Sequence, residues 1–146
     1  MAPAGAGLPA LGLTVCEDAW TEPMGYEVDP TGELAGQGAA LCVNVSASPF
    51  HVGKAAERRA MVSALAARHA VPILFCNQVG GNDELVFDGA SFAVDAHGRV
   101  LASLPHFETA LEVLELEAGG AQEPDPERAA QLEADPLVPR SVQPPG

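Results

Sequence analysis

Positive charge is scarce in this sequence. Its 146 residues contain 7 Lys and Arg against 20 Asp and Glu, which gives a formal net charge of −13. A protein that binds nucleic acid neutralises phosphates with clustered Lys and Arg, and this sequence has no such cluster. We therefore exclude nucleic acid as a partner. Much of the acidic excess lies after residue 107, so the rest of the chain is only mildly acidic.

Cysteine and long apolar runs are also scarce. The three cysteines, Cys16, Cys42 and Cys76, lie far apart and show neither a CxxC pair nor Cys/His ligand spacing. We therefore expect no disulfide scaffold and no metal site. No apolar stretch is long enough to cross a membrane, and the first residues lack the basic segment and apolar core of a signal peptide. These absences predict a cytoplasmic protein that does not bind a membrane.

Length and composition limit the fold to one domain or part of one. A chain of 15.0 kDa that is 47% hydrophobic can bury one ordinary core. Residues 1–10 are small and rich in Gly and Pro, which predicts a disordered N-terminus. Residues 121–146 contain many prolines and few apolar side chains, which predicts a proline-rich acidic linker or tail. The folded part is thus expected over residues 11–120.

The first half of this part alternates apolar runs with one amphipathic segment. Residues 11–16, 39–45 and 72–78 are predicted strands, and the second of them is expected to be buried on both faces. Residues 55–69 carry an apolar stripe of 3.6-residue periodicity, which predicts a helix that ends before the following Val-Pro pair. This alternation predicts a βαβ unit and an α/β fold. Residues 21–38 are turn-rich and predict an excursion with at most a short helix.

The second half predicts antiparallel structure. Short strands are expected over residues 85–87, 91–94 and 100–104. The turn residues Asp88-Gly89 and the segment 95–98 lie between them, which predicts two hairpins. In residues 111–117 apolar and acidic positions nearly alternate, so this segment is predicted to be an edge strand with one wet face.

Cys16 is the first candidate for chemistry, because a predicted strand ends there. Glu17 and Asp18 follow it at once, so the thiol is expected at a strand's carboxyl edge, where open α/β sheets bind ligands. A thiol in this place can act as a nucleophile. The alternative is a structural cysteine, since cysteines are often buried as small hydrophobes.

Two polar loops follow the next predicted strands. Residues 44–51 form a loop that could bind a small polar substrate. This loop leads into Gly53-Lys54, and Lys54 is the only lysine of the chain. The alternative is a Ser/Pro turn that caps the next helix and leaves Lys54 in solvent. Residues 77–84 contain two glycines but no phosphate-loop pattern, so we do not predict a nucleotide site there.

A thiol nucleophile needs a base. Of the 4 histidines, His69, His97 and His106 each have a structural interpretation, and only His51 lies in a loop that could approach Cys16. No orienting Asn or Asp is identifiable from spacing, so a Cys16–His51 dyad is disfavoured.

Three blocks of the sequence, taken together, resemble one family. They are residues 12–20 (GLTVCEDAW), residues 44–50 (NVSASPF) with Gly53-Lys54, and residues 77–89 (NQVGGNDELVFDG). In this order they resemble the glutaminase domain of glutamine-dependent NAD synthetases, which belongs to the nitrilase superfamily, and the resemblance covers about residues 11–118. It implies a four-layer αββα sandwich in which Cys16 attacks the side-chain amide of glutamine. By the same resemblance the backbone N–H of Glu17 helps to hold the oxyanion, and Ser48 and Lys54 contact glutamine.

The sequence also departs from the family. The family's general-base glutamate and oxyanion lysine both precede the nucleophile, but the 15 residues before Cys16 contain neither Glu nor Lys. The synthetase domain, which by resemblance binds ATP and Mg, has no counterpart here, so no cofactor is expected in this chain. These departures predict the C-terminal half of a glutaminase domain, inactive alone and either poorly soluble or partnered.

Two other interpretations stay open. One is a separate nitrilase-type amidase or carbamoylase, and the other is a non-catalytic interaction remnant. Full-length members of the family assemble into oligomers, which implies a homo-oligomer for a full-length relative of this chain.

Overall fold

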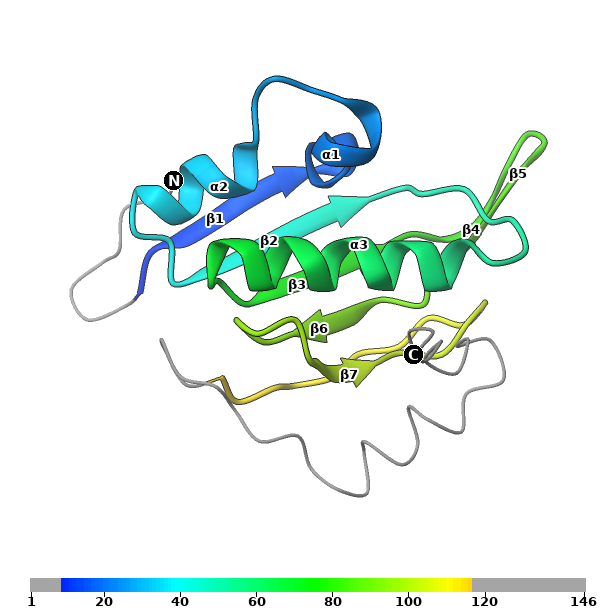
Figure 1. Ribbon diagram of the computed structural model, residues 1–146. Helices are drawn as coiled ribbons and strands as arrows, with labels where there is room; N and C mark the ends of the chain where they lie inside the picture. The colour runs from blue at the N-terminus through cyan, green and yellow to red at the C-terminus, as the bar shows by residue number, and fades with distance from the viewer. Residues whose placement is uncertain (1–8, 117–146) are drawn as a thin grey trace, which may run out of the picture.

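The computed structural model describes residues 9–116, and its centre is a five-stranded mixed sheet (Figure 1). The strands lie in the order β1-β2-β3-β6-β7. They are β1 (Leu11–Val15), β2 (Leu41–Ser46), β3 (Ile73–Asn77), β6 (Phe92–Val94) and β7 (Val100–Ser103). The first three are parallel and the last two antiparallel. The predicted N-terminal segment, apart from its last two residues, and the predicted tail lie outside the described residues.

Two helices cover one face of this sheet, α2 (Pro30–Gly36) and α3 (Lys54–His69) (Figure 1). The predicted apolar stripe of α3 is buried at Val62, Leu65 and Ala66, which share a core cluster with Phe75 of β3 and Phe92 of β6. The helix and the β2-α3-β3 unit with parallel strands are therefore confirmed. No helix within residues 9–116 is long and apolar enough to cross a membrane.

Gly12 allows α2 to pack closely on β1. A Cβ atom at this position would lie 2.8 Å from the Cys42 sulfur and 3.2 Å from the Leu34 Cβ. Cys42 is itself buried in this core. The segment 21–38 forms two short helices, α1 (Thr21–Met24) and α2, whereas the sequence predicted at most one.

The opposite face of β1 and β2 is largely exposed among the described residues, whereas Leu74 of β3 packs on that face with Leu114 and Leu116. Leu13 is 64% exposed, Val15 58% and Val45 49%, although all three are apolar strand residues. The expectation that residues 39–45 are buried on both faces was therefore wrong. In β2 only Cys42, Asn44 and Ser46 are buried, because α2 and α3 lie on one side of the sheet alone.

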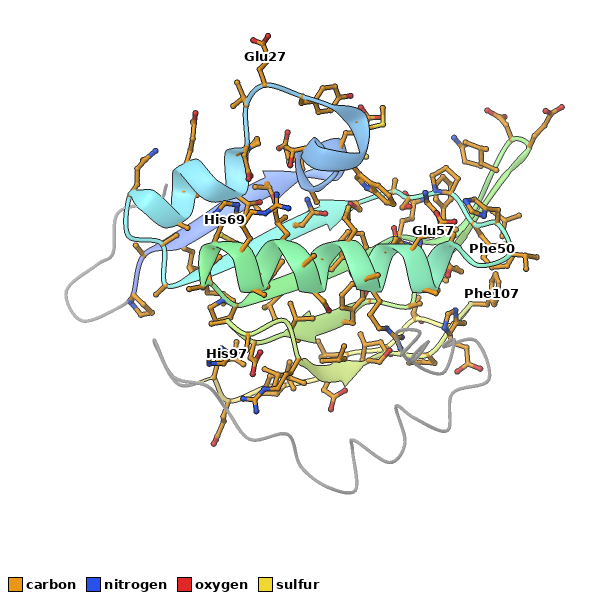
Figure 2. All side chains as sticks on the ribbon, in the orientation of Figure 1. Glu27, Phe50, Glu57, His69, His97 and Phe107 are labelled. Atoms are coloured by element: carbon orange, nitrogen blue, oxygen red, sulfur yellow. The ribbon has the colours of Figure 1, made fainter. Side chains whose placement is uncertain are left out.

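The hairpins differ in part from the prediction. The hairpin of β6 and β7 around residues 95–98 is confirmed. The hairpin predicted at Asp88-Gly89 is wrong, because β5 (Leu85–Asp88) pairs with β4 (Val79–Asn82), a strand that was not predicted. This second hairpin projects from the body of the molecule (Figure 1). At its base Phe50 packs edge-to-face on Phe107, with ring centroids 5.1 Å apart (Figure 2).

The predicted edge strand over residues 111–117 does not form within its described part, residues 111–116. Leu114 and Leu116 pack against the cluster of Ala93, Leu101 and Ala102, but Leu111 and Val113 are exposed. The apolar positions thus anchor an irregular segment by side-chain contacts, without the backbone ladder that a strand requires.

Candidate active site at the ends of the parallel strands

Cys16 lies where β1 ends and a 3-10 helix, η1 (Cys16–Ala19), begins. Its φ is +50°, in the left-handed region that costs a non-glycine residue roughly 1–3 kcal/mol. A hydrogen bond of 2.8 Å from the Val15 backbone N–H to Asp18 Oδ2 spans this turn and stabilises it. The strand direction therefore changes abruptly at the thiol, which remains partly exposed.

A cavity of 480 Å³ opens beside Cys16. Eight residues from the ends of the three parallel strands line it: Val15, Cys16, Val45, Ser46, Ala47, Cys76, Asn77 and Gln78. The strand register brings them together, since Val15 pairs with Val45 and Val45 pairs with Cys76. The structure therefore joins Cys16 to the beginnings of both polar loops that the sequence singled out.

The buried side chain of Asn44 forms hydrogen bonds that link the backbone of Cys16 to the neighbouring strand. Asn44 Nδ2 donates to Thr14 Oγ1 at 3.0 Å and to the Cys16 carbonyl at 3.4 Å. The side-chain oxygen Asn44 Oδ1 accepts a hydrogen bond of 2.6 Å from Ser46 Oγ. One buried amide thus connects the nucleophile candidate to a residue that lines the cavity.

Ser48 is buried, and its peptide is held on both sides. Its N–H donates to Asn77 Oδ1 at 2.8 Å, and its carbonyl accepts from Arg58 Nη1 at 3.3 Å. Arg58 in turn forms an ion pair with Asp88, and both side chains are 0% exposed. His106 Nδ1 lies 3.3 Å from the same Asp88 oxygen. The loop that contains Ser48 therefore rests on a buried charged cluster.

Lys54 and Glu17, like Ser48, do not line the cavity. Lys54 Nζ lies 4.0 Å from the centroid of the Trp20 ring and 3.3 Å from Glu57 Oε2. The Glu17 carboxylate accepts a hydrogen bond of 3.1 Å from the Tyr26 hydroxyl. This hydrogen bond, with the negative charge of Glu17, raises the Tyr26 pKa. Lys54 thus connects the start of α3 to the end of η1.

The cavity contains no histidine. His51 is exposed, and its Nε2 lies 3.8 Å from Glu57 Oε2. His69 Nε2 lies 2.7 Å from Asp29 Oδ2 and joins α3 to the start of α2. The structure therefore gives no support to a Cys16–His51 dyad. Within residues 9–116, no group of three His, Cys, Asp or Glu side chains could hold a metal ion.

The surroundings of Cys42 and Cys76 raise the pKa values of their thiols. Cys42 is buried under α2, and burial raises its pKa. Cys76 is exposed and lines the same cavity as Cys16, and partial desolvation raises the pKa of its thiol. A raised pKa lowers the fraction of thiolate, which is the nucleophilic form.

Sequence reasoning missed the buried residues around Ser48. Arg58 lies one helical turn after Lys54. Its place on the same side of α3 as the apolar stripe was the sequence signal for a buried charge. Asp88 was assigned to a turn, although it is fully buried at the end of β5. Asn77 was counted among the loop residues, with no role for its side chain.

Comparison with known proteins defines the class. Residues 5–123 match the family model of carbon-nitrogen hydrolases, so the chain belongs to the carbon-nitrogen hydrolase family.

Among the curated proteins, the chain is similar to glutamine-dependent NAD(+) synthetases. It is 43% identical to the one from Synechocystis sp. over an alignment of 109 residues, and the match covers 71% of this chain and 20% of that protein. It is 42% identical to the one from Rhodobacter capsulatus over 115 residues, 79% of this chain and 20% of that protein. The chain thus spans about a fifth of the length of these relatives.

The fold is similar to those of solved nitrilase-superfamily structures. The glutamine-dependent NAD+ synthetase of Acinetobacter baumannii, in complex with ADP, matches with a TM-score of 0.61 and 27% identity over 74% of this chain and 22% of that chain. A mutant amidase from Nesterenkonia sp. AN1 matches with a TM-score of 0.53 and 26% identity over 65% of this chain and 33% of that chain. In that structure the acetamide moiety of fluoroacetamide is covalently added at the active site cysteine.

Proposed function

We propose that Cys16 is the nucleophile of a glutamine amidohydrolase that supplies ammonia for NAD synthesis. The observation that carries this proposal is the position of Cys16: a left-handed residue at the end of a parallel strand, beside a cavity formed by three strand ends. The similarity to glutamine-dependent NAD synthetases supports glutamine as the substrate. The cysteine adduct of the related amidase supports covalent chemistry at a thiol.

The proposed reaction has two steps. The Cys16 thiolate attacks the side-chain carbonyl carbon of glutamine, and the backbone N–H of Glu17 helps to hold the resulting oxyanion. The C–N bond then breaks, and the nitrogen leaves as ammonia after gaining a proton, which leaves a thioester on Cys16. Water hydrolyses the thioester to glutamate and regenerates the thiol. Ser48 and Lys54 are the proposed contacts for the amino-acid part of glutamine.

Two groups that this chemistry needs are not among the residues before Cys16. The base that takes protons and the lysine that stabilises the oxyanion have no counterpart there, since the first 15 residues contain neither Glu nor Lys. We propose that polypeptide outside the 146 residues supplies the base and the oxyanion lysine. The 146 residues alone would then bind glutamine without turnover. The ammonia would pass to a synthetase domain that uses ATP and Mg, in a cytoplasmic and oligomeric enzyme.

Covalent labelling tests this proposal. The probe is 6-diazo-5-oxo-L-norleucine, a glutamine-shaped electrophile, and intact and peptide mass spectrometry locate the adduct. We expect one adduct on Cys16 that glutamine suppresses and that Cys16→Ser abolishes. Cys76→Ser is the matched control, because Cys76 lines the same cavity but its pKa is raised. Labelling that persists in Cys16→Ser would contradict the assignment.

The amidase structure favours a second candidate, an amidase for small amides. Fluoroacetamide separates the two functions. A glutamine hydrolase is expected to react faster with the glutamine-shaped probe, and a small-amide hydrolase faster with fluoroacetamide. A chain that reacts with neither, while iodoacetamide still modifies Cys16, is a non-catalytic remnant.

A further inference from the structure

We infer that Arg58 and Asp88 are positioning residues that hold the Ser48 loop in the shape that accepts the substrate. This inference rests on the proposed function, because it assigns to Ser48 a contact with glutamine. Neither Arg58 nor Asp88 lines the cavity. They act through the peptide of Ser48, which lies two residues beyond the cavity residue Ser46.

The Ser48 peptide is clamped by two side chains that depend on one short segment. On one side, Arg58 Nη1 donates to the Ser48 carbonyl, and Arg58 Nη2 donates to Asp88 Oδ2. On the other side, Asn77 Oδ1 accepts from the Ser48 N–H, and Asn77 Nδ2 donates to the Gly89 carbonyl at 2.9 Å. Asp88-Gly89 therefore fixes both anchors of the loop.

The burial of the ion pair argues for precise placement. Both side chains are 0% exposed, so neither charge can exchange its partner for water. A buried ion pair adds little net stability, but removal of one partner leaves an uncompensated charge. The planar guanidinium reaches Asp88 and Ser48 at the same time, which one lysine ammonium does not reproduce. The ion pair thus carries a desolvation cost, and it fixes the position of the Ser48 carbonyl relative to Asp88.

The neighbouring Arg59 supplies a matched control. It lies on the same helix, but its Nη2 donates to Ser103 Oγ on β7 at 3.1 Å, away from the Ser48 loop. Arg58→Lys and Arg59→Lys therefore make the same chemical change on the same helix. Only the first of them is expected to disturb the Ser48 peptide.

The test uses the 146-residue chain and three measurements. The first is the rate at which 6-diazo-5-oxo-L-norleucine labels Cys16 below saturation, the second is the rate with iodoacetamide, and the third is hydrogen exchange of the Ser48 amide. We expect Arg58→Lys to slow labelling by the glutamine-shaped probe about tenfold, the effect of losing one charge-assisted hydrogen bond. The Ser48 amide should exchange faster in this variant. The iodoacetamide rate should stay within about twofold, since it depends on the thiolate alone.

The outcomes separate the two levels of the proposal. Equal probe labelling in wild type and Arg58→Lys overturns the positioning role, and so does a parallel loss with iodoacetamide. Wild type that reacts with iodoacetamide but not with the glutamine-shaped probe overturns the proposed function, and this inference with it. If Arg58→Lys does not fold, the double variant Arg58→Gln/Asp88→Asn replaces the ion pair by a neutral hydrogen-bonded pair. The same slower labelling is expected of it.

Discussion

The Asn44 side-chain amide donates a hydrogen bond of 3.0 Å to the Thr14 hydroxyl, across the two strands that end beside Cys16. Asn44 is 1% exposed, and it also accepts from Ser46. Replacing Asn44 by Ala leaves the hydroxyl of Ser46 buried without this partner. We expect Asn44→Ala to lower the free energy of unfolding by about 1–3 kcal/mol, measured by urea unfolding followed by far-UV circular dichroism.

Asn82→Ala is the matched control for this prediction. Asn82 also lies in a strand, β4, but it is exposed. Its replacement should change the free energy of unfolding by no more than about 0.5 kcal/mol. Equal effects of the two substitutions would show that the buried amide makes no special contribution.

The features that the sequence predicted well are those that local pattern determines. The α3 helix follows from an apolar stripe within one segment, and its predicted start differs from the observed one by a single residue. The place of Cys16 follows from the end of an apolar run. The sequence also placed two polar loops after the next strands, and their convergence on Cys16 became visible only with the parallel register, which brings the carboxyl ends of the strands to one edge.

The missed features depend on partners far away in the chain. Asp88 forms its ion pair with Arg58, 30 residues earlier, so its local sequence Asp-Gly indicates only a turn. The strand β4 is rich in glycine and becomes a strand only by pairing with β5. The alternation in residues 111–116 has the period of a strand, yet no strand within residues 9–116 pairs with that segment, and Leu114 and Leu116 instead pack against a core cluster.

Asp95 predicts how stability depends on pH. Burial by itself raises the pKa of this carboxyl. The backbone N–H groups of Arg99 and His97 and the Arg99 guanidinium together lower the pKa by more than burial raises it, so the net pKa lies below its ordinary value. A lowered pKa contributes stability that is present above the unfolded-state pKa of about 3.9. This contribution is lost as the pH falls through the folded-state pKa.

We therefore expect Asp95→Asn to destabilise the chain at pH 7 and to have a smaller effect in strong acid. Urea unfolding at the two pH values measures the difference. Asp83→Asn is the control, since Asp83 is an exposed turn residue whose left-handed φ suits Asn equally well. An effect of Asp95→Asn that is the same at both pH values would refute the role of the carboxylate charge.

The uncovered sheet face predicts self-association of the 146-residue chain. Leu13, Val15 and Val45 form an exposed apolar patch on the parallel strands β1 and β2, a kind of surface that associates in water. We expect the double variant Leu13→Thr/Val45→Thr to shift the chain toward monomer. Size-exclusion chromatography with light scattering, over a range of protein concentrations, measures the shift.

The control for this prediction changes two apolar side chains elsewhere that are even more exposed. Leu111→Thr/Val113→Thr removes the same kinds of side chain from the irregular segment that follows the hairpin of β6 and β7. It should leave the association state unchanged. A wild-type chain that is monomeric at every concentration would contradict the prediction.

Turnover is the last prediction, and it separates a nucleophile from a complete catalyst. Acyl transfer from an amide needs a proton acceptor and a stabilised oxyanion as well as a thiol, and no Glu or Lys precedes Cys16 here. We expect the 146-residue chain to release no ammonia from glutamine above background. The complementary test places the aligned part of this chain in the Synechocystis synthetase, in exchange for the segment with which it aligns. The chimera should form NAD with glutamine as the nitrogen donor. With Cys16→Ser it should lose this activity and keep the activity with added ammonia, because the synthetase part is unchanged. Ammonia release by the chain alone that depends on Cys16 would show that the remaining groups lie within these 146 residues.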